Sequence, residues 1–437
     1  MTEKRKAYID TWGCQMNYHR SEGITGILNS HGYSLVESPS KADLILFNTC
    51  AVRGRSEEKV RGRLGQIEAE RKPDSILGIG GCMAQHMGSN LLGDMKGVDF
   101  VFGTSNLSRI PEFAAAAREE NNLAATPPPE GFEHLTYSRE SDYFAWVTIA
   151  EGCSNNCSYC IVPRVRGPLR SRGTNEVLNE VHQLVDREYK EIQLLGQNVN
   201  AYGKDRPDQK DSFSTLLEKV AQTGIPRLSF TTPNPADLEM KTLDIMNDNS
   251  NIVRHLHLPL QSGSNHVLDL MNRDYTREEY LHIVDLARDQ DPFINITTDV
   301  IVGHPGESEE DFQETLEIIN EVKFGSVYAA KFSPRPGTPS AKIDNQVKEQ
   351  VKQQRLEKIL TTQKETNIAE NERFIGEIQK VLIEGKARSN GKVYGKNEFK
   401  RTVLLPGGEE LVGQFVDTRI EEGDRGTLYG KMEEQQQ

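Results

Sequence analysis

Short apolar runs alternate with longer amphipathic segments along the first part of the chain. The apolar runs predict strands at Ala7–Thr11, Asp43–Phe47, Ser75–Ile79 and Val98–Phe102. The amphipathic segments predict helices at residues 21–32 and 56–69. Alternation of this kind is typical of a parallel sheet with helices on both faces. We therefore expect an N-terminal α/β domain over residues 1–125.

A second series of the same kind follows a stretch without strand or helix periodicity. That stretch, residues 126–142, contains Pro127, Pro128 and Pro129 and is predicted to be a linker. Beyond it, strands are predicted at Phe144–Ala150, Glu191–Leu195, Arg227–Thr231, His255–Leu258, Ile294–Val302 and Tyr328–Phe332. Helical segments separate these strands, so a closed or partly closed parallel barrel is expected over residues 143–371, with its site at the strands' carboxyl ends.

The pattern changes again at Glu372, where short strands alternate with glycine-rich turns. The predicted strands are Glu377–Glu384, Lys392–Tyr394, Arg401–Leu405, Leu411–Val416 and Thr427–Gly430. Such a series indicates a small all-β barrel over residues 372–437. The whole chain is thus predicted to be α/β, with a parallel-sheet domain, a partial (β/α) barrel and a small β-barrel.

Composition and charge narrow the class of protein. The chain is 36% hydrophobic and 27% charged, as globular proteins are, and it has no apolar run long enough to cross a bilayer. The charged segment Met1–Arg5 leads straight into a strand and does not fit a signal peptide, so a cytoplasmic location is expected. A formal net charge of −13 argues against a nucleic-acid partner, although binding depends on local basic patches.

The chain has six cysteines, and three of them form a CxxxCxxC motif directly after the first predicted barrel strand: Cys153, Cys157 and Cys160. Thiolates suit soft metals and iron–sulfur clusters. Three ligands on a short loop can hold three irons of a cubane and leave the fourth open to the amino and carboxylate groups of S-adenosylmethionine. The alternative is a structural zinc site, which needs a fourth ligand that the neighbouring sequence does not supply.

The other three cysteines, Cys14, Cys50 and Cys82, are far apart in the sequence. Each one follows a predicted strand, and open α/β sheets place their ligands beyond the carboxyl ends of strands. A second three-cysteine site is one interpretation. Three buried cysteines with only a packing role are the other, and the spacing does not decide between them.

Four motifs give the chain a specific resemblance: Thr11–Asn17, Asn48–Arg53, Gly81–Gln85 and the CxxxCxxC loop. They resemble the methylthiotransferases, a radical S-adenosylmethionine family, and the resemblance covers essentially the whole chain, including a C-terminal RNA-binding TRAM barrel. Gln15–Asn17 and Leu194–Tyr202 resemble the branch that acts on prenylated adenosine in tRNA.

The resemblance implies two [4Fe–4S] clusters. One, on Cys14, Cys50 and Cys82, would carry the sulfur to be inserted, and the other, on Cys153, Cys157 and Cys160, would cleave S-adenosylmethionine. One S-adenosylmethionine would provide the methyl group and another the radical. The product would be 2-methylthio-N6-dimethylallyladenosine at position 37 of tRNA. No catalytic residue is expected beyond the cluster ligands.

Alternative functions remain at this point. Sibling branches of the family methylthiolate a threonylcarbamoyl-adenosine in tRNA or an aspartate of a ribosomal protein. A noncatalytic RNA-binding iron–sulfur sensor is an alternative of another class, but a sensor has no need for an S-adenosylmethionine site.

Six residues are predicted to bind S-adenosylmethionine: Tyr159, Gln197, Asn198, Gln261, Ser262 and Asp299. Tyr159, Gln197 and Asn198 resemble positions where the superfamily contacts the adenine and the methionine amino group. Gln261, Ser262 and Asp299 lie on or just after barrel strands and could reach the ribose or methionine. A core role for Tyr159 and a turn role for Asn198 are the alternatives.

Nine cations are candidates for RNA contact: Arg53, Arg55, Arg335, Lys386, Arg388, Lys392, Lys396, Lys400 and Arg401. Those after Lys386 are interleaved with Tyr394 and Phe399, which suits phosphate binding and base stacking. The resemblance implies a tRNA anticodon stem-loop as partner. It also implies a low-potential electron donor such as flavodoxin or ferredoxin and a sulfur-supply or cluster-assembly protein, with no membrane partner.

Overall fold

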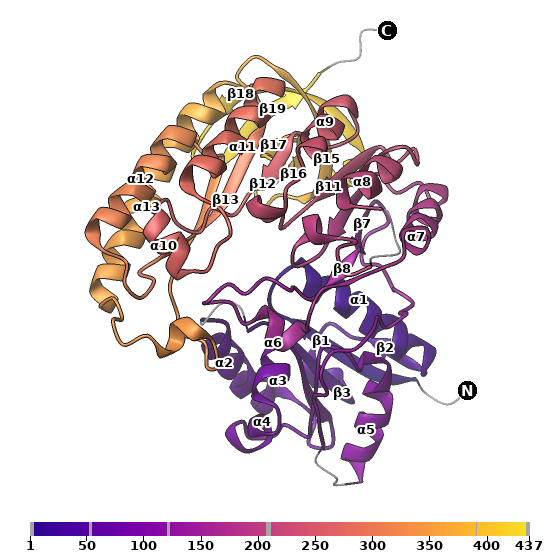
Figure 1. Cartoon of the computed structure of the whole chain (residues 1–437). Coiled ribbons are helices and arrows are strands. Elements are labelled where there is room, and N and C mark those ends of the chain that lie inside the picture. Colours follow the sequence, from indigo (N-terminus) through magenta and orange to yellow (C-terminus); the bar gives the residue numbers. More distant parts are fainter. Residues whose placement is uncertain (1–3, 52–54, 120–122, 207–210, 390, 434–437) are drawn as a thin grey trace.

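The computed structural model describes residues 4–51, 55–119, 123–206, 211–389 and 391–433, and it confirms the predicted three-part architecture (Figure 1). The N-terminal part is a parallel sheet of order β2-β1-β3-β4-β5-β6. Its strands are β1 (Arg5–Thr11), β2 (Tyr33–Leu35), β3 (Leu44–Thr49), β4 (Ile76–Gly81), β5 (Phe100–Phe102) and β6 (Leu123–Ala125). The edge strands β2 and β6 were not predicted, because three residues are too few to show a period.

Helices cover both faces of this sheet, as its sequence pattern requires. They are α1 (Gln15–Ser30), α2 (Arg55–Glu70), α3 (Cys82–Met87), α4 (Asn90–Asp94) and α5 (Ile110–Arg118). On one face Ile24 of α1 and Phe113 of α5 share an apolar cluster with the sheet, and on the other Ile67 of α2 packs with Met83 of α3. Strands β3 and β4 are buried along their whole length, which explains their continuous apolar runs.

The central part is an open half-barrel of parallel strands. One sheet joins β11 (Arg227–Phe230), β10 (Glu191–Leu195) and β7 (Phe144–Thr148), and the other joins β12 (His255–His257), β13 (Asn295–Val302) and β14 (Ser326–Lys331). A bridge between Leu228 and Ile252 connects the two sheets. The predicted strands are thus confirmed, as a partly closed barrel.

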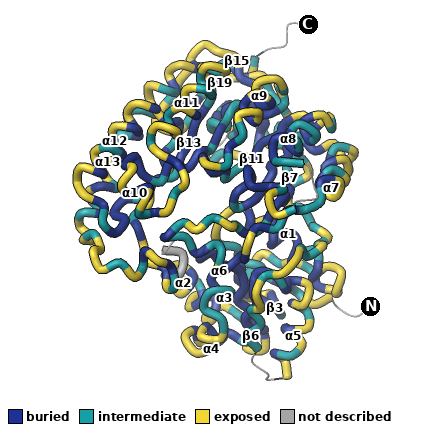
Figure 2. Tube along the Cα trace, in the orientation of Figure 1, coloured by how far each residue is buried: buried dark blue, intermediate teal, exposed yellow. Residues whose placement is uncertain are grey.

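Helices form the outer layer of this half-barrel. Figure 2 shows that the strands of the half-barrel are buried and that the outer faces of the helices are exposed. They are α7 (Thr174–Asp186), α8 (Phe213–Ala221), α9 (Met240–Asp248), α10 (Asn265–Leu270), α11 (Arg277–Gln290), α12 (Glu309–Val322) and α13 (Glu349–Glu372). The hairpin β8 (Ala150–Glu151)–β9 (Arg170–Ser171) and the short α6 (Val162–Arg166) lie toward the N-terminal domain (Figure 1). Among the described residues, no helix has the length and apolar character needed to cross a bilayer.

The C-terminal part is a closed barrel of order β15-β16-β17-β19-β18. Its strands are β15 (Ile378–Lys386), β16 (Lys392–Lys396), β17 (Thr402–Pro406), β18 (Phe415–Gly423) and β19 (Thr427–Met432). The predicted strand at Leu411–Val416 is wrong in position. Leu411 ends a 3-10 turn and Gly413 has a positive φ of 81°, so the strand begins only at Phe415.

This small barrel packs against the amino ends of the half-barrel strands. Arg227, the first residue of β11, donates to the backbone oxygens of Lys396 and Lys380 at 2.8 Å each. Asn295, the first residue of β13, donates to the oxygen of Phe399 at 2.7 Å. Lys400 pairs with Glu191, which begins β10 and is 1% exposed. The carboxyl ends of the strands therefore remain free for a site.

We expect Lys400→Ala to destabilise this contact by about 3 kcal/mol, because it leaves the Glu191 carboxylate buried without its main partner. The matched control is Lys386→Ala, which removes an exposed pair with Glu409 and should cost less than about 1 kcal/mol. The free energy of unfolding of each variant is measured by urea titration, and hydrogen exchange of the amides in β10 and β15 shows whether the contact itself is weakened. Equal losses in the two variants would contradict a buried role for the Lys400–Glu191 pair.

Candidate functional site

The CxxxCxxC loop lies between β8 and α6, at the carboxyl end of the half-barrel. Backbone hydrogen bonds anchor it at several points: Cys153 N donates to Gly167 O at 3.1 Å, and Ser158 N donates to Met271 O at 2.9 Å. Gly152 has a positive φ of 76°, and a Cβ there would lie 2.0 Å from the oxygen of Pro168. The chain thus needs glycine at this turn to present the three cysteines together.

The three thiols of this loop share one partly buried environment. Burial raises the pKa of Cys153 and raises that of Cys160 to about 12, and each of these thiols also lies close enough to Cys157 for the two charges to interact. The guanidinium of Arg273 donates from Nη1 to Cys157 Sγ at 3.2 Å and from Nη2 to Asn234 Oδ1 at 2.7 Å. A cation is therefore fixed beside thiolates that a metal centre would require.

The scattered cysteines also meet at one edge of their sheet. Cys14 follows β1, Cys50 follows β3 and Cys82 begins α3 directly after β4, and these strands are neighbours in the order β1-β3-β4. A Cβ on Gly13 would lie 2.7 Å from Cys50 Cβ, so the ends of β1 and β3 are in close contact. Cys50 and Cys82 are buried, whereas Cys14 is exposed.

The donor chemistry of both trios is compatible with an iron–sulfur cluster. In the part of the chain that the structure describes, no three His, Cys, Asp or Glu side chains converge so as to hold one metal ion. A cubane takes each thiolate on a different iron, so its ligands need not converge on one point. Thiolates without histidine are also the donor set of such clusters.

The segment that follows the CxxxCxxC motif packs against the N-terminal trio at the boundary between the N-terminal domain and the half-barrel. Cys82 and Ala51 share a small buried cluster with Ile161 and Val165, which directly follow the CxxxCxxC motif. Thr104 Oγ1 donates to the oxygen of Val165 at 2.8 Å, which ties the domains together at the same place. Helix α6, which follows the CxxxCxxC loop, therefore lies beside α3, which begins at Cys82 (Figure 1).

The side chains predicted to bind S-adenosylmethionine from the first sheet lie around the loop. Gln197 Oε1 accepts a hydrogen bond from Gly152 N, so it supports the cysteine loop itself. Asn198 Nδ2 donates to Asp237 at 2.6 Å, and its Oδ1 is buried without a hydrogen-bond partner among the described residues. Tyr159 is partly buried with its ring 6.5 Å from that of His304, edge to face.

The predicted residues of the second sheet have mixed positions. The Asp299 carboxylate is partly exposed, and its Oδ2 lies 3.1 Å from His257 Nε2. Gln261 has a positive φ of 67° and joins β13 through its backbone, donating to Asp299 O at 2.9 Å. Ser262 is buried beside Thr315 of α12, with 3.3 Å between the two hydroxyl oxygens, and its role in cofactor binding stays a prediction.

Sequence patterns did not indicate two polar residues beside the cysteine loop, Arg273 and Asp237. Asp237 accepts hydrogen bonds from Asn198 and Asn234 and pairs with Lys204. Burial alone would raise the pKa of Asp237, but the hydrogen bonds from Lys204 and Asn198 hold it below its usual value. These residues follow other strands and helices, so only the fold brings them to the loop.

The predicted RNA contacts separate into three groups. Arg53 lies outside the described residues, and the structure describes the backbone of Arg55 but not its side chain. Lys386, Arg388 and Lys392 are exposed on the C-terminal barrel. Arg335 is buried in its loop.

The remaining three predicted contacts require correction. Lys396, Lys400 and Arg401 are directed at the protein interior: Lys400 pairs with Glu191, and Arg401 donates to Asn371 Oδ1 at 2.7 Å. Burial lowers the pKa of Lys396, and it lowers that of Arg401 to about 10. Lys400 and Arg401 therefore stabilise contacts between the small barrel and the half-barrel, whereas Lys396 donates to Thr402 Oγ1 at 2.6 Å within the small barrel.

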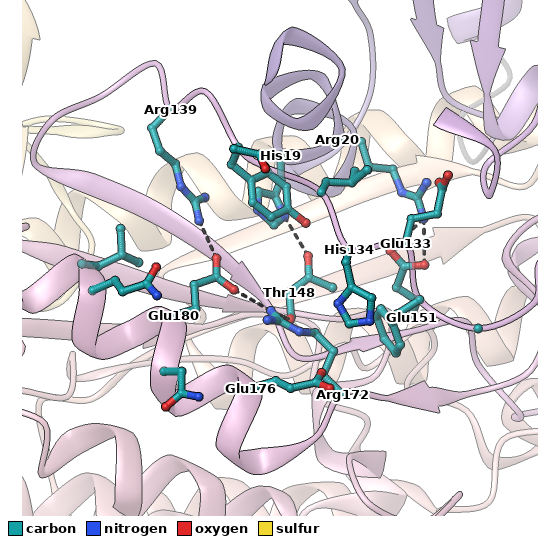
Figure 3. Close-up of a pocket in the computed structure, with 18 of the residues that line it drawn as sticks. His19, Arg20, Glu133, His134, Arg139, Thr148, Glu151, Arg172, Glu176 and Glu180 are labelled. Carbon is teal, nitrogen blue, oxygen red and sulfur yellow. Dashed lines mark hydrogen bonds and ion pairs between the residues drawn. The ribbon is translucent and has the colours of Figure 1, made fainter. Parts of the chain in front are cut away.

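A separate polar cavity of about 500 Å³ lies on the domain boundary between α1, α7 and residues 131–139 (Figure 3). Three of the arginines that line it are already paired: Arg20 with Glu151, and both Arg139 and Arg172 with Glu180. No cysteine lines it. The cavity therefore belongs to the packing of the linker rather than to the cysteine sites.

Comparison with known proteins covers all three parts. Family models match residues 6–103 (Uncharacterized protein family UPF0004), 147–319 (Radical SAM superfamily) and 372–432 (TRAM domain). The chain is 42% identical to a tRNA-2-methylthio-N(6)-dimethylallyladenosine synthase of Natranaerobius thermophilus, covering 98% of this chain and 97% of that protein. A protein of the same name from Geotalea uraniireducens is 41% identical, covering 99% and 100%.

A solved structure shares the fold at low sequence identity. The radical S-adenosylmethionine methyltransferase TsrM from Kitasatospora setae, with cobalamin and a [4Fe-4S] cluster bound, aligns with a TM-score of 0.56 at 14% identity, covering 77% of each chain. At that identity the likeness concerns the fold alone. The family is shown by the longer sequence matches.

Proposed function

The chain belongs to the family of tRNA-2-methylthio-N(6)-dimethylallyladenosine synthases, and we propose that it converts N6-dimethylallyladenosine at position 37 of tRNA into its 2-methylthio derivative, using two [4Fe–4S] clusters. The radical S-adenosylmethionine domain makes it an enzyme with radical chemistry. Two clusters, rather than one, are the finer part of the proposal.

The observation that carries the proposal is that the segment following one cysteine trio, Ile161 and α6, packs against Cys82 and α3 of the other. One trio ends the strands of the N-terminal sheet, and the other follows β8 of the half-barrel. A reaction that joins sulfur to a carbon radical needs the sulfur centre and the radical centre at one place. Two separate packing roles for the cysteines would not require this arrangement.

The residues of the half-barrel have defined tasks in this proposal. Cys153, Cys157 and Cys160 hold the cluster that supplies the electron for cleavage of S-adenosylmethionine. Arg273 fixes Cys157, and Gln197 fixes the backbone of the loop at Gly152. The orphaned Oδ1 of Asn198 and the partly exposed Asp299 are acceptors for the amino or ribose groups of the bound S-adenosylmethionine.

The N-terminal trio holds the sulfur-carrying cluster. Cys14 is exposed, whereas Cys50 and Cys82 are buried. The Cys14 side of this site is therefore open to the substrate, and the side of Cys50 and Cys82 is closed to solvent. A low-potential electron donor such as flavodoxin or ferredoxin and a sulfur-supply or cluster-assembly protein complete the proposed partners. The cytoplasm remains the expected location.

Nucleoside mass spectrometry tests the reaction and its substrate. Cells that lack this protein are expected to accumulate N6-dimethylallyladenosine without the 2-methylthio group in their tRNA, and the wild-type chain should restore the product. Cys50→Ala is the matched control and should not restore it, because it removes one ligand of the N-terminal trio. A change in threonylcarbamoyl-adenosine or in a ribosomal-protein aspartate, with the prenylated nucleoside unaffected, would contradict the proposed substrate.

A further inference from the structure

Arg166 is a buried cation at the boundary between the two cysteine trios. It is the last residue of α6, the helix that follows the CxxxCxxC loop, and it is 4% exposed. In the described part of the chain, no carboxylate lies within ion-pair distance of it, and its Nη1 has no hydrogen-bond partner. Burying a guanidinium without a counter-charge costs several kcal/mol, so its surroundings call for an anion.

The nearest candidates for that anion belong to the other domain. The Cys82 and Cys14 thiols are the two groups whose charge, when they are ionised, acts most strongly on Arg166, with Glu151 behind them. Val165, the preceding residue, packs directly with Cys82, which places the end of α6 at the N-terminal trio independently of any charge.

A hydrogen bond orients the guanidinium toward this site. Arg166 Nη2 donates to Asn17 Oδ1 at 2.9 Å, and Asn17 Nδ2 donates to Trp12 O at 2.9 Å. Asn48 Nδ2 in turn donates to Asn17 O at 2.7 Å. This buried chain of contacts links Arg166 to the segments that carry Cys14 and Cys50.

We propose that Arg166 is a positioning residue that supplies, from the half-barrel, the counter-charge of the cluster held by Cys14, Cys50 and Cys82. Three thiolates and an iron–sulfur core make an anionic group, and this group would take the place of the carboxylate that the buried guanidinium lacks. The assignment rests on the proposed function, which places a cluster on this trio. It goes further, because it makes cluster binding in one domain depend on a residue of the other.

Two consequences follow from a fixed positive charge at this position. It favours the more negative, reduced state of the cluster, so it raises the reduction potential. It also holds the cluster only while the N-terminal domain and the half-barrel are docked. An arginine whose only role was the hydrogen bond to Asn17 would change neither the reduction potential nor the retention of the cluster.

The test uses the full chain with Cys153, Cys157 and Cys160 replaced by alanine, so that only the N-terminal trio can hold a cluster. Iron and sulfide analysis of this parent tests the proposed function first: a parent without a cluster would overturn that assignment before Arg166 is considered. Arg166→Met is then compared with Arg164→Met, which removes an exposed charge from the same helix.

Arg166→Met is expected to lose iron to a chelator about tenfold more readily than the parent and to show a more negative midpoint potential in an EPR-monitored titration. Arg164→Met should match the parent in both measurements. Arg166→Lys keeps the charge and should keep the potential close to that of the parent, even if its shorter side chain loses Asn17.

The melting temperature of the metal-free protein distinguishes a structural role of Arg166 from a role that depends on the cluster. Because Arg166 lacks a paired carboxylate when the cluster is absent and then keeps only its hydrogen bond to Asn17, Arg166→Met should lower the melting temperature of the metal-free parent much less than that of the cluster-loaded parent. A melting temperature that falls equally in the metal-free and loaded forms would overturn the proposal. A potential and iron retention equal to those of Arg164→Met would overturn it as well.

Discussion

Cys157→Ala is expected to abolish reductive cleavage of S-adenosylmethionine, whereas Cys50→Ala is expected to stop methylthiolation of tRNA and spare part of the cleavage. The physical reason is that the two cysteines belong to different trios on different domains. Cys157 shares its loop with Cys153 and Cys160 and is held by Arg273 at 3.2 Å. Cys50 follows β3 of the N-terminal sheet.

The measurement is formation of 5′-deoxyadenosine by reconstituted protein in the absence of oxygen, beside nucleoside analysis of tRNA. Iron and sulfide analysis with Mössbauer spectroscopy accompanies it, since two clusters in the wild type correspond to about eight irons per chain and each variant should lose half. Equal loss of cleavage in both folded variants would contradict the division of tasks. A single cluster in fully active wild type would contradict the second trio as a site.

Elements buried on both faces were predictable from the sequence, and edge elements were not. Strands β3 and β4 are covered by helices on each side, so all their positions are apolar and the run is unmistakable. The edge strands β2 and β6 are short and half-exposed, and their sequences show no period. The error at Leu411–Val416 has a similar cause: Leu411 and Val412 are apolar because they pack against the barrel, not because they form a strand.

In the candidate site, the ligands on one short loop could be predicted from the sequence, whereas the residues that surround them could not. A CxxxCxxC motif places three ligands on one loop, so its sequence alone indicates a metal centre. The environment of those ligands comes from distant segments: Arg273 lies 116 residues beyond Cys157, and Arg166 lies 149 residues beyond Asn17. Sequence spacing gives no signal for such partners.

The position of a charged residue in the sequence also does not predict whether its side chain faces solvent or the protein interior. Lys396, Lys400 and Arg401 look like part of one basic stretch with Lys386, Arg388 and Lys392. The partner of Lys400 is Glu191, 209 residues earlier, and that pair lies between two barrels. Only the folded arrangement separates the cations that hold the protein together from those that face solvent.

This separation also decides how RNA binding should be tested. Deletion of residues 372–437 would remove the barrel that contacts Arg227, Asn295 and Glu191, and it would take away the Lys400 partner of the buried Glu191 and both backbone acceptors of the buried Arg227. Loss of activity in such a truncation would report misfolding of the half-barrel as readily as loss of RNA. Substitution of the exposed cations avoids this ambiguity.

Replacing Lys386, Arg388 and Lys392 together with glutamine is expected to weaken tRNA binding and to reduce the slope of log affinity against log salt by roughly 2 to 3. Arg388 is exposed, Lys386 forms an exposed pair with Glu409, and the Lys392 Nζ lies 5.9 Å from the centre of the Tyr429 ring. Each can therefore reach a phosphate without breaking a buried contact. With a net charge of −13, the molecule repels RNA at long range, so local cations must carry the attraction.

The matched control replaces Lys348, Lys358 and Lys364 with glutamine, because these lysines are exposed on or beside α13 and the change in net charge is the same. Affinity for tRNA is measured across a salt series for the wild type and both triple variants, with thermal unfolding to verify that all three are folded. The control should bind more weakly only to the small extent that net charge dictates, with an unchanged slope. Identical slopes in the two triple variants would show that another surface of the protein holds the RNA, since phosphate neutralisation at Lys386, Arg388 and Lys392 could not then contribute to binding.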